Sequence, residues 1–152
     1  MLYRAPTAQK DERRNIEQEI RVHITDLANE PDSAILNLRV ADCYMQLGRC
    51  SDAEDFYRRA LEYDTADPRA MRGLAYACAK QGRGIEAYGY LREADSLRHR
   101  ILMIEGPLTE EMFQQMQQEI EEDAGLIRDL DPRRKRKEEK VEETEEEVGA
   151  SN

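Results

Sequence analysis

One pattern of small residues occurs twice in the chain, as ADCYMQLGRCSDAEDFYRRALEY at residues 41–63 and as AYACAKQGRGIEAYGYLREADSL at residues 75–97. A shift of 34 residues superposes alanine on alanine and glycine on glycine, and larger residues also coincide. The superposed pairs are Ala41 with Ala75, Gly48 with Gly82, Ala53 with Ala87, Ala60 with Ala94, Val40 with Leu74, and Phe56 with Tyr90. Because unrelated helical segments seldom repeat small residues at one phase, the pattern predicts tandem structural units.

Each unit has the spacing of two short helices joined near Gly48 or Gly82. Small residues let two helix backbones approach closely, and larger residues fill the gaps beside them. Glycine ends a helix without strain in the left-handed conformation, and Ser51 and Asp52 are predicted caps of the helix that follows Gly48. Since neither unit can bury its apolar face alone, the units are expected to stack.

These positions resemble the tetratricopeptide repeat family. The matching residues are Val40, Ala41, Tyr44, Gly48, Ala53, Tyr57 and Ala60 in the first unit, and Leu74, Ala75, Gly82, Ala87, Leu91 and Ala94 in the second. The chain departs from the family pattern at Asn37 and Met71 (tryptophan in the family), at Thr65 and His99 (proline), and at Cys78 (an aromatic residue). The resemblance implies an all-α fold, a short solenoid of antiparallel helix pairs with flanking capping helices.

Breaks in the apolar periodicity divide the chain further. An N-terminal helix over about residues 11–28 carries Ile16, Ile20, Ile24 and Leu27 as an apolar stripe and stops at Pro31. In the family register it is either the second helix of a truncated repeat or a free-standing cap. The predicted parts are 1–33 with this helix, 34–67 and 68–105 as the two repeats, the second with a long final helix, 106–131 as an acidic capping helix, and 132–152 as a disordered charged tail.

The acidic helix should begin after the Gly106-Pro107 break, with Thr109 as its cap and Leu108 packed on Phe113 as a hydrophobic staple. Met112 and Met116 are expected to fill the core of the protein rather than to form an adaptable binding surface. The helix is expected to cover the open end of the helical stack. The tail has too few apolar residues to offset the entropy of ordering it.

The formal net charge of −10 is concentrated in one stretch. Residues 34–99 hold ten basic and ten acidic residues, whereas residues 100–131 hold two basic and nine acidic residues. General nucleic-acid binding requires a basic surface, so it is disfavoured. No run of about 18 apolar residues occurs, which argues against membrane insertion. Three cysteines and the lack of an N-terminal apolar signal favour a reducing cytoplasm as the location.

The residues offer little catalytic chemistry. His23 and His99 are far apart in sequence, and there is no glycine-rich phosphate loop or paired-histidine metal motif. Cys43, Cys50 and Cys78 are expected to be small hydrophobic residues of helices rather than zinc ligands. We therefore expect neither an enzyme nor a bound cofactor or metal.

In tetratricopeptide arrays the first helix of each repeat lines a concave groove. The resemblance assigns eight residues to a partner-binding groove: Ile35, Leu38, Asp42 and Met45 from the first repeat, and Arg69, Arg72, Tyr76 and Lys80 from the second. Helical periodicity alone puts the second four on one helix face. A solvated charged face would explain Arg69 and Arg72 equally well. Family members that clamp a terminal carboxylate use asparagines and lysines at set groove positions, and Asp42 occupies one of these positions, where its charge would repel that ligand.

These features favour a protein-binding adaptor or scaffold whose groove holds a partner peptide or helix with apolar anchors and acidic groups. Two alternatives stay open. The size and layout resemble a cytoplasmic secretion chaperone of the type III class that shields a client protein, and the acidic helix could instead be the contact surface of a structural subunit. A homo-oligomer is compatible with either one.

Overall fold

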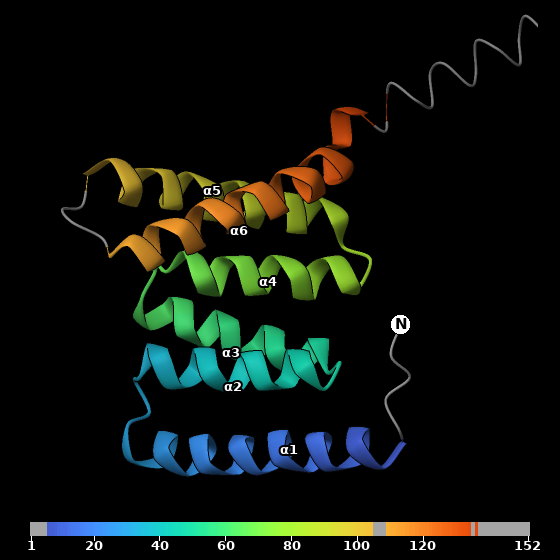
Figure 1. The fold of residues 1–152 in the computed structure, drawn as a ribbon, viewed down its shortest axis with the longest axis vertical. Helices are drawn as coiled ribbons and strands as arrows, with labels where there is room; N and C mark the ends of the chain where they lie inside the picture. The colour runs from blue at the N-terminus through green and yellow to red at the C-terminus, as the bar shows by residue number, and fades with distance from the viewer. Residues whose placement is uncertain (1–5, 105–108, 135, 137–152) are drawn as a thin grey trace, which may run out of the picture. The chain divides into compact units, whose positions relative to one another are not determined.

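The computed structural model describes residues 6–104, 109–134 and 136. Within these residues the chain forms helices and no strands, which confirms the predicted all-α class (Figure 1). The helices are α1 (Pro6–Asn29), α2 (Ala34–Gln46), α3 (Cys50–Tyr63), α4 (Pro68–Lys80), α5 (Gly84–Ile104) and α6 (Glu110–Leu130). The predictions for Leu108 and for residues 137–152 concern positions outside the described residues.

The chain divides into two compact units, Met1–Leu97 and Arg98–Asn152, and the division falls within α5. In the first unit α1, α2, α3 and α4 alternate in direction, and each packs on the next in chain order (Figure 1). In addition α2 contacts α4, the helix that runs parallel to it. The two helices that the sequence assigns to a common binding face are therefore neighbours in space.

Local sequence fixes the ends of these helices. The Ser33 hydroxyl accepts a hydrogen bond from the Leu36 amide at the start of α2, and Asp67 caps α4 in the same way, with Pro68 in its first turn. Gly48 and Gly82 have φ angles of 74° and 78°, the left-handed conformation that glycine adopts without strain.

The expected caps of α3 were wrong. The helix begins at Cys50, so Ser51 and Asp52 lie inside it, and the residue before it, Arg49, makes no side-chain cap. Asp52 instead accepts a hydrogen bond from Nε of Arg49 at 2.7 Å. Its carboxylate still lies in the first turn, where it complements the helix dipole.

Small side chains fill the interior of the first unit. The six alanines of the repeat pattern are at most 2% exposed, and they lie among larger buried residues. The alanines are Ala41, Ala53, Ala60, Ala75, Ala87 and Ala94, and their larger neighbours in the core include Val40, Tyr57, Leu74 and Leu91. Burial of these positions is what brings the helix backbones close together.

Apolar periodicity overstated the burial of two helices. Among the α1 residues from Gln9 onward, Ile20 alone is buried, whereas Ile24 is 41% exposed, because a helix at the end of a stack buries a narrow stripe. On α5 Ile85 is 75% exposed in the first turn. Periodicity locates the inward side of a helix but does not say how much of that side another element covers.

In the second unit a buried ion pair joins the end of α5 to α6. Arg98 donates to Asp123 at 2.6 Å and to Glu119 at 3.3 Å, and the Arg98 and Asp123 side chains are 1% and 0% exposed. Thr109 caps α6 as predicted, by accepting from the Met112 amide at 3.3 Å. Beyond Asp131 the chain makes one more helical turn at residues 132–134, part of the stretch that the sequence predicts to be disordered.

Candidate functional site

The eight residues assigned to the groove lie on α2 and α4, and we call them together the α2/α4 face. Their exposure differs. Ile35 is 56% exposed and Met45 is half-buried, but Leu38 is only 6% exposed and belongs to the core. Arg69, Lys80 and Asp42 are exposed. Leu38 can therefore support a binding surface from beneath and offers little area to a partner.

Tyr57 of α3 reaches between the two helices of this face. Its hydroxyl donates a hydrogen bond to the Asp42 carboxylate of α2 at 2.7 Å. Its ring lies against Gly73 of α4, so closely that a Cβ at Gly73 would stand 2.2 Å from the ring carbon Cζ. Tyr57 itself is 2% exposed. Because its ring is confined between α2 and α4, Tyr57 fixes how close these two helices come.

Burial and neighbouring groups change the pKa of Asp42 in opposite directions. Partial burial raises the pKa of Asp42, while the hydrogen bond from Tyr57 and the positive charge of Arg69 act in the opposite direction. Burial, together with the bond to Asp42, raises the pKa of the Tyr57 phenol. The charge of Arg69 on α4 thus acts on Asp42 of α2, which places the two predicted helix faces along one surface.

Arg69 is engaged within its own helix. Its backbone amide donates to Asp67 at 2.9 Å, and its guanidinium donates twice more to the same carboxylate, at 3.1 Å and 2.9 Å. The Arg69 side chain is nevertheless 63% exposed. A nearby carboxylate offsets its charge, so Arg69 contributes less positive potential to the face than its sequence position implies.

Two other cations lie further along α4. The Arg72 guanidinium lies over the ring of Tyr76, 5.1 Å from its centroid, in a cation–π contact that holds both side chains in place. Lys80, in the last turn of α4, is exposed. Arg72 and Lys80 thus add two positive charges to the α4 side of the face.

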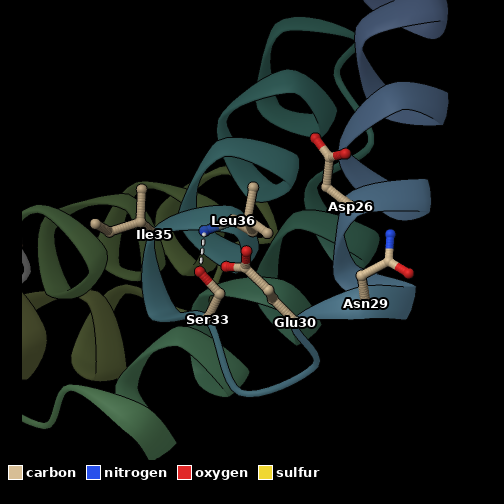
Figure 2. Close-up of a pocket in the computed structure, with 6 residues that line it drawn as sticks. All are labelled: Asp26, Asn29, Glu30, Ser33, Ile35 and Leu36. Atoms are coloured by element: carbon tan, nitrogen blue, oxygen red, sulfur yellow. Dashed lines mark hydrogen bonds between the residues drawn. The ribbon is translucent and has the colours of Figure 1, made fainter.

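A pocket of about 310 Å³ lies where α1 turns into α2, at the Ile35 end of the face (Figure 2). Two carboxylates line it, together with polar groups and aliphatic side chains; the six residues are Asp26, Asn29, Glu30, Ser33, Ile35 and Leu36. The repeat pattern predicts Ile35 on the face but gives no signal for its acidic neighbours, because Asp26 and Glu30 precede the repeats in the chain.

A second feature that the sequence analysis missed is a polar cluster around Glu54 of α3. Its carboxylate accepts from Arg58 at 2.6 Å, from Gln81 at 2.9 Å and from Arg83. Burial opposes ionisation, but the hydrogen bonds from Arg83 and Gln81 and the charge of Arg58 prevail and lower the pKa of Glu54. This cluster ties α3 to the turn between α4 and α5, so its role is to hold consecutive repeats together.

The remaining reactive side chains are dispersed. Cys43 and Cys78 are buried free thiols, and Cys43 contacts the Glu19 carboxylate at 3.7 Å. Burial raises the pKa of both thiols, and the Glu19 charge adds to the effect at Cys43. Among the described side chains, no three His, Cys, Asp or Glu residues gather where they could hold a metal ion. No described helix is long and apolar enough to cross a lipid bilayer.

Comparison with known proteins agrees with this architecture. The family model of the tetratricopeptide repeat matches residues 13–68 and, again, residues 41–99. Among solved structures, the chain is similar to MamA MSR-1 C2, with a TM-score of 0.54 and 21% sequence identity. The similarity covers 57% of this chain and 49% of that one, about half of its length, and at this identity it concerns the fold alone. No curated protein matches the chain significantly.

Proposed function

Since the chain belongs to the tetratricopeptide repeat family, a fold that serves as a protein-binding scaffold, we propose that it is an adaptor that holds a partner segment along the α2/α4 face. The partner segment is a helix or an extended peptide with apolar anchors and acidic groups. This mode uses helix-in-groove or extended-peptide recognition on a rigid helical surface.

The observation that carries the proposal is the position of Tyr57. Its hydroxyl bonds Asp42 of α2, while its ring abuts Gly73 of α4, in the middle of the face. A surface whose two sides are held at a fixed separation loses little entropy when a partner binds. The α2/α4 face is therefore preorganised.

The side chains of the face suggest how a partner lies. Ile35 and Met45 offer apolar contact, and Arg72 and Lys80 offer positive charge toward the end of α4. The carboxylates of Asp26 and Glu30 border Ile35, so an acidic partner residue would be repelled at that end. A matching segment carries an apolar residue at the Ile35 end and its acidic groups opposite Arg72 and Lys80.

Asp42 restricts the class of ligand. A terminal carboxylate placed beside it would meet like charge, and Tyr57 already occupies Asp42 as a hydrogen-bond donor. This argues for an internal segment of the partner, in preference to a free C-terminus.

The test begins with a pull-down from the native host that identifies the partner, followed by calorimetry with purified chains. The double reversal Arg72→Glu and Lys80→Glu should weaken binding at least about fivefold, because attraction between these two positions and the acidic groups of the partner becomes repulsion. Lys10→Glu with Arg21→Glu is the matched control, because it changes the net charge equally on exposed positions of α1. Equal affinity in the two variants would exclude the α2/α4 face as the binding surface.

The two alternatives make different predictions. A secretion chaperone of the type III class should copurify with a client protein and keep it soluble. A structural subunit that uses its acidic helix should form a defined oligomer when purified alone. Sedimentation of the purified chain and of the chain with its client separates these from a simple adaptor.

A further inference from the structure

The first half of α6 is uncovered. Of the ten residues from Thr109 to Gln118, nine are exposed and only Met116 is half-buried. Burial begins in the second half, where Asp123 is the one fully buried residue among those of α6 that the structure describes. The ion pairs of Arg98 with Asp123 and Glu119 anchor that second half. The ion pairs thus anchor the second half of α6, whereas the described side chains of its first half are mostly exposed.

The exposed half has favourable local interactions for a helix. Thr109 caps it, and Glu110 and Glu111 in the first turn complement the helix dipole. Along its flank Gln114 donates to Glu110 at 2.8 Å, and Gln118 donates to Glu122 at 2.8 Å. Such pairs four residues apart each favour the helix by about 0.2–0.5 kcal/mol.

Apolar side chains occupy this uncovered half, contrary to the expectation that they fill the core. Met112 is 46% exposed and Phe113 is 38% exposed. Together with Met116, one turn beyond Met112, they form a continuous apolar strip, which we call the α6 strip. Methionine side chains adapt to partners of differing shape, and an aromatic ring among them supplies an anchor.

The charge around the α6 strip defines what could cover it. Residues 100–131 carry nine acidic and two basic residues. An anionic membrane surface attracts basic helices and would repel this one. A second copy of α6 would bring like charges together. A segment with an apolar face and basic flanks complements both the strip and its glutamates.

We propose that the α6 strip is a second docking surface, which binds a basic amphipathic helix of a partner protein. It is distinct from the α2/α4 face, whose proposed ligand is acidic. Binding buries Met112 and Phe113 against apolar residues of the incoming helix, while lysines or arginines of that helix pair with Glu110 and Glu111 in the same turn of α6. The two surfaces therefore select ligands of opposite charge.

The test uses the full chain and a fluorescent 14-residue peptide of leucine and lysine, patterned with one apolar helical face. Anisotropy should detect binding, and amide resonances of residues 109–122 should shift on titration of isotope-labelled chain. The double variant Met112→Gln and Phe113→Gln should weaken binding at least about tenfold. Ile85→Gln is the matched control, since Ile85 is a 75% exposed apolar residue elsewhere, and it should bind as the parent does.

Three results would overturn the proposal: unchanged affinity of the double variant, equal binding of a peptide with the same composition but no apolar face, or self-association of the chain that the double variant abolishes. The third would assign the strip to a second copy. Far-UV circular dichroism checks that helicity is kept. If the double variant loses helicity, Glu110→Gln with Glu111→Gln replaces it, and unchanged affinity and salt dependence in that variant would count against the proposal. Failure here leaves the α2/α4 proposal intact, because no residue of that face is changed.

Discussion

Replacing Gly73 by alanine should destabilise the protein, although alanine is the better helix former. In the interior of α4, the substitution removes the entropic cost of glycine and favours the fold by about 1 kcal/mol. The added Cβ, however, would stand 2.2 Å from Cζ and 2.3 Å from Cε1 of Tyr57. These separations are far below van der Waals contact, so either the ring or the α4 backbone must move.

The environment of Tyr57 decides the size of the effect. The ring is 2% exposed and cannot swing into solvent, and its hydroxyl is bonded to Asp42 at 2.7 Å. Overpacking a core costs about 1–3 kcal/mol, and loss of a hydrogen bond to a charged group costs about 1.5–3 kcal/mol. With both costs, and after subtraction of the helix-propensity gain, Gly73→Ala should lower the free energy of unfolding by about 1.5–5 kcal/mol.

Urea unfolding followed by circular dichroism measures this free energy. Gly89→Ala is the matched control, because Gly89 also lies within a helix but no atom lies within 4 Å of its would-be Cβ. It should stabilise by up to about 1 kcal/mol. In a Tyr57→Leu background, which removes the ring, Gly73→Ala should lose most of its penalty. If Gly73→Ala instead stabilises the parent as much as Gly89→Ala does, the close packing of Tyr57 on α4 is refuted.

Three further predictions concern the charged groups. Asp42→Asn should raise the urea midpoint near pH 7, with the gain vanishing below about pH 4, because a raised pKa gives stability below the ordinary value of 3.8 that is lost as the pH rises. Glu54→Gln should destabilise by about 1–3 kcal/mol at pH 7 by weakening the bond from Arg83, and it should flatten the loss of stability below pH 4.5 that follows from a lowered pKa. Asp123→Ala should leave buried Arg98 with the longer contact to Glu119 and cost up to about 3–5 kcal/mol, measured as faster amide exchange in α6, whereas Arg98→Met with Asp123→Leu should restore protection.

Sequence periodicity predicted the class of fold and the approximate position of each helix in the chain, because helices and turns are signalled by residues close together in sequence. Gly48 and Gly82 mark turns by their own backbone preference, and Pro68 and Thr109 mark helix starts. The predicted cap of α3 was wrong because serine and aspartate favour cap positions in general, so Ser51 and Asp52 do not identify the first residue of the helix. The structure shows that the helix begins at Cys50.

The details of the candidate site could not be predicted from periodicity, since they depend on contacts between residues of different helices and turns. Gly73 is not among the positions at which the two repeats coincide. Its contact with Tyr57 explains why a glycine lies in the middle of α4. The compensation of Arg69 by Asp67 and the acidic border at Glu30 likewise involve charges outside the predicted face. Helix spacing predicts that side chains share a face but not which of their charges are already neutralised.

Burial along α6 changes how the overall acidity should be understood. Acidic residues in a helix without exposed apolar side chains would simply form a solvated surface. Instead the strip of Met112, Phe113 and Met116 is at least partly open, and the anchored Asp123 lies further along the same helix. An acidic surface beside an open apolar strip disfavours self-association and anionic lipid, and it leaves basic protein segments as the complementary ligands. Most of the net charge of −10 therefore belongs to residues 100–131, whereas the charges of residues 34–99, which contain the two repeats, balance.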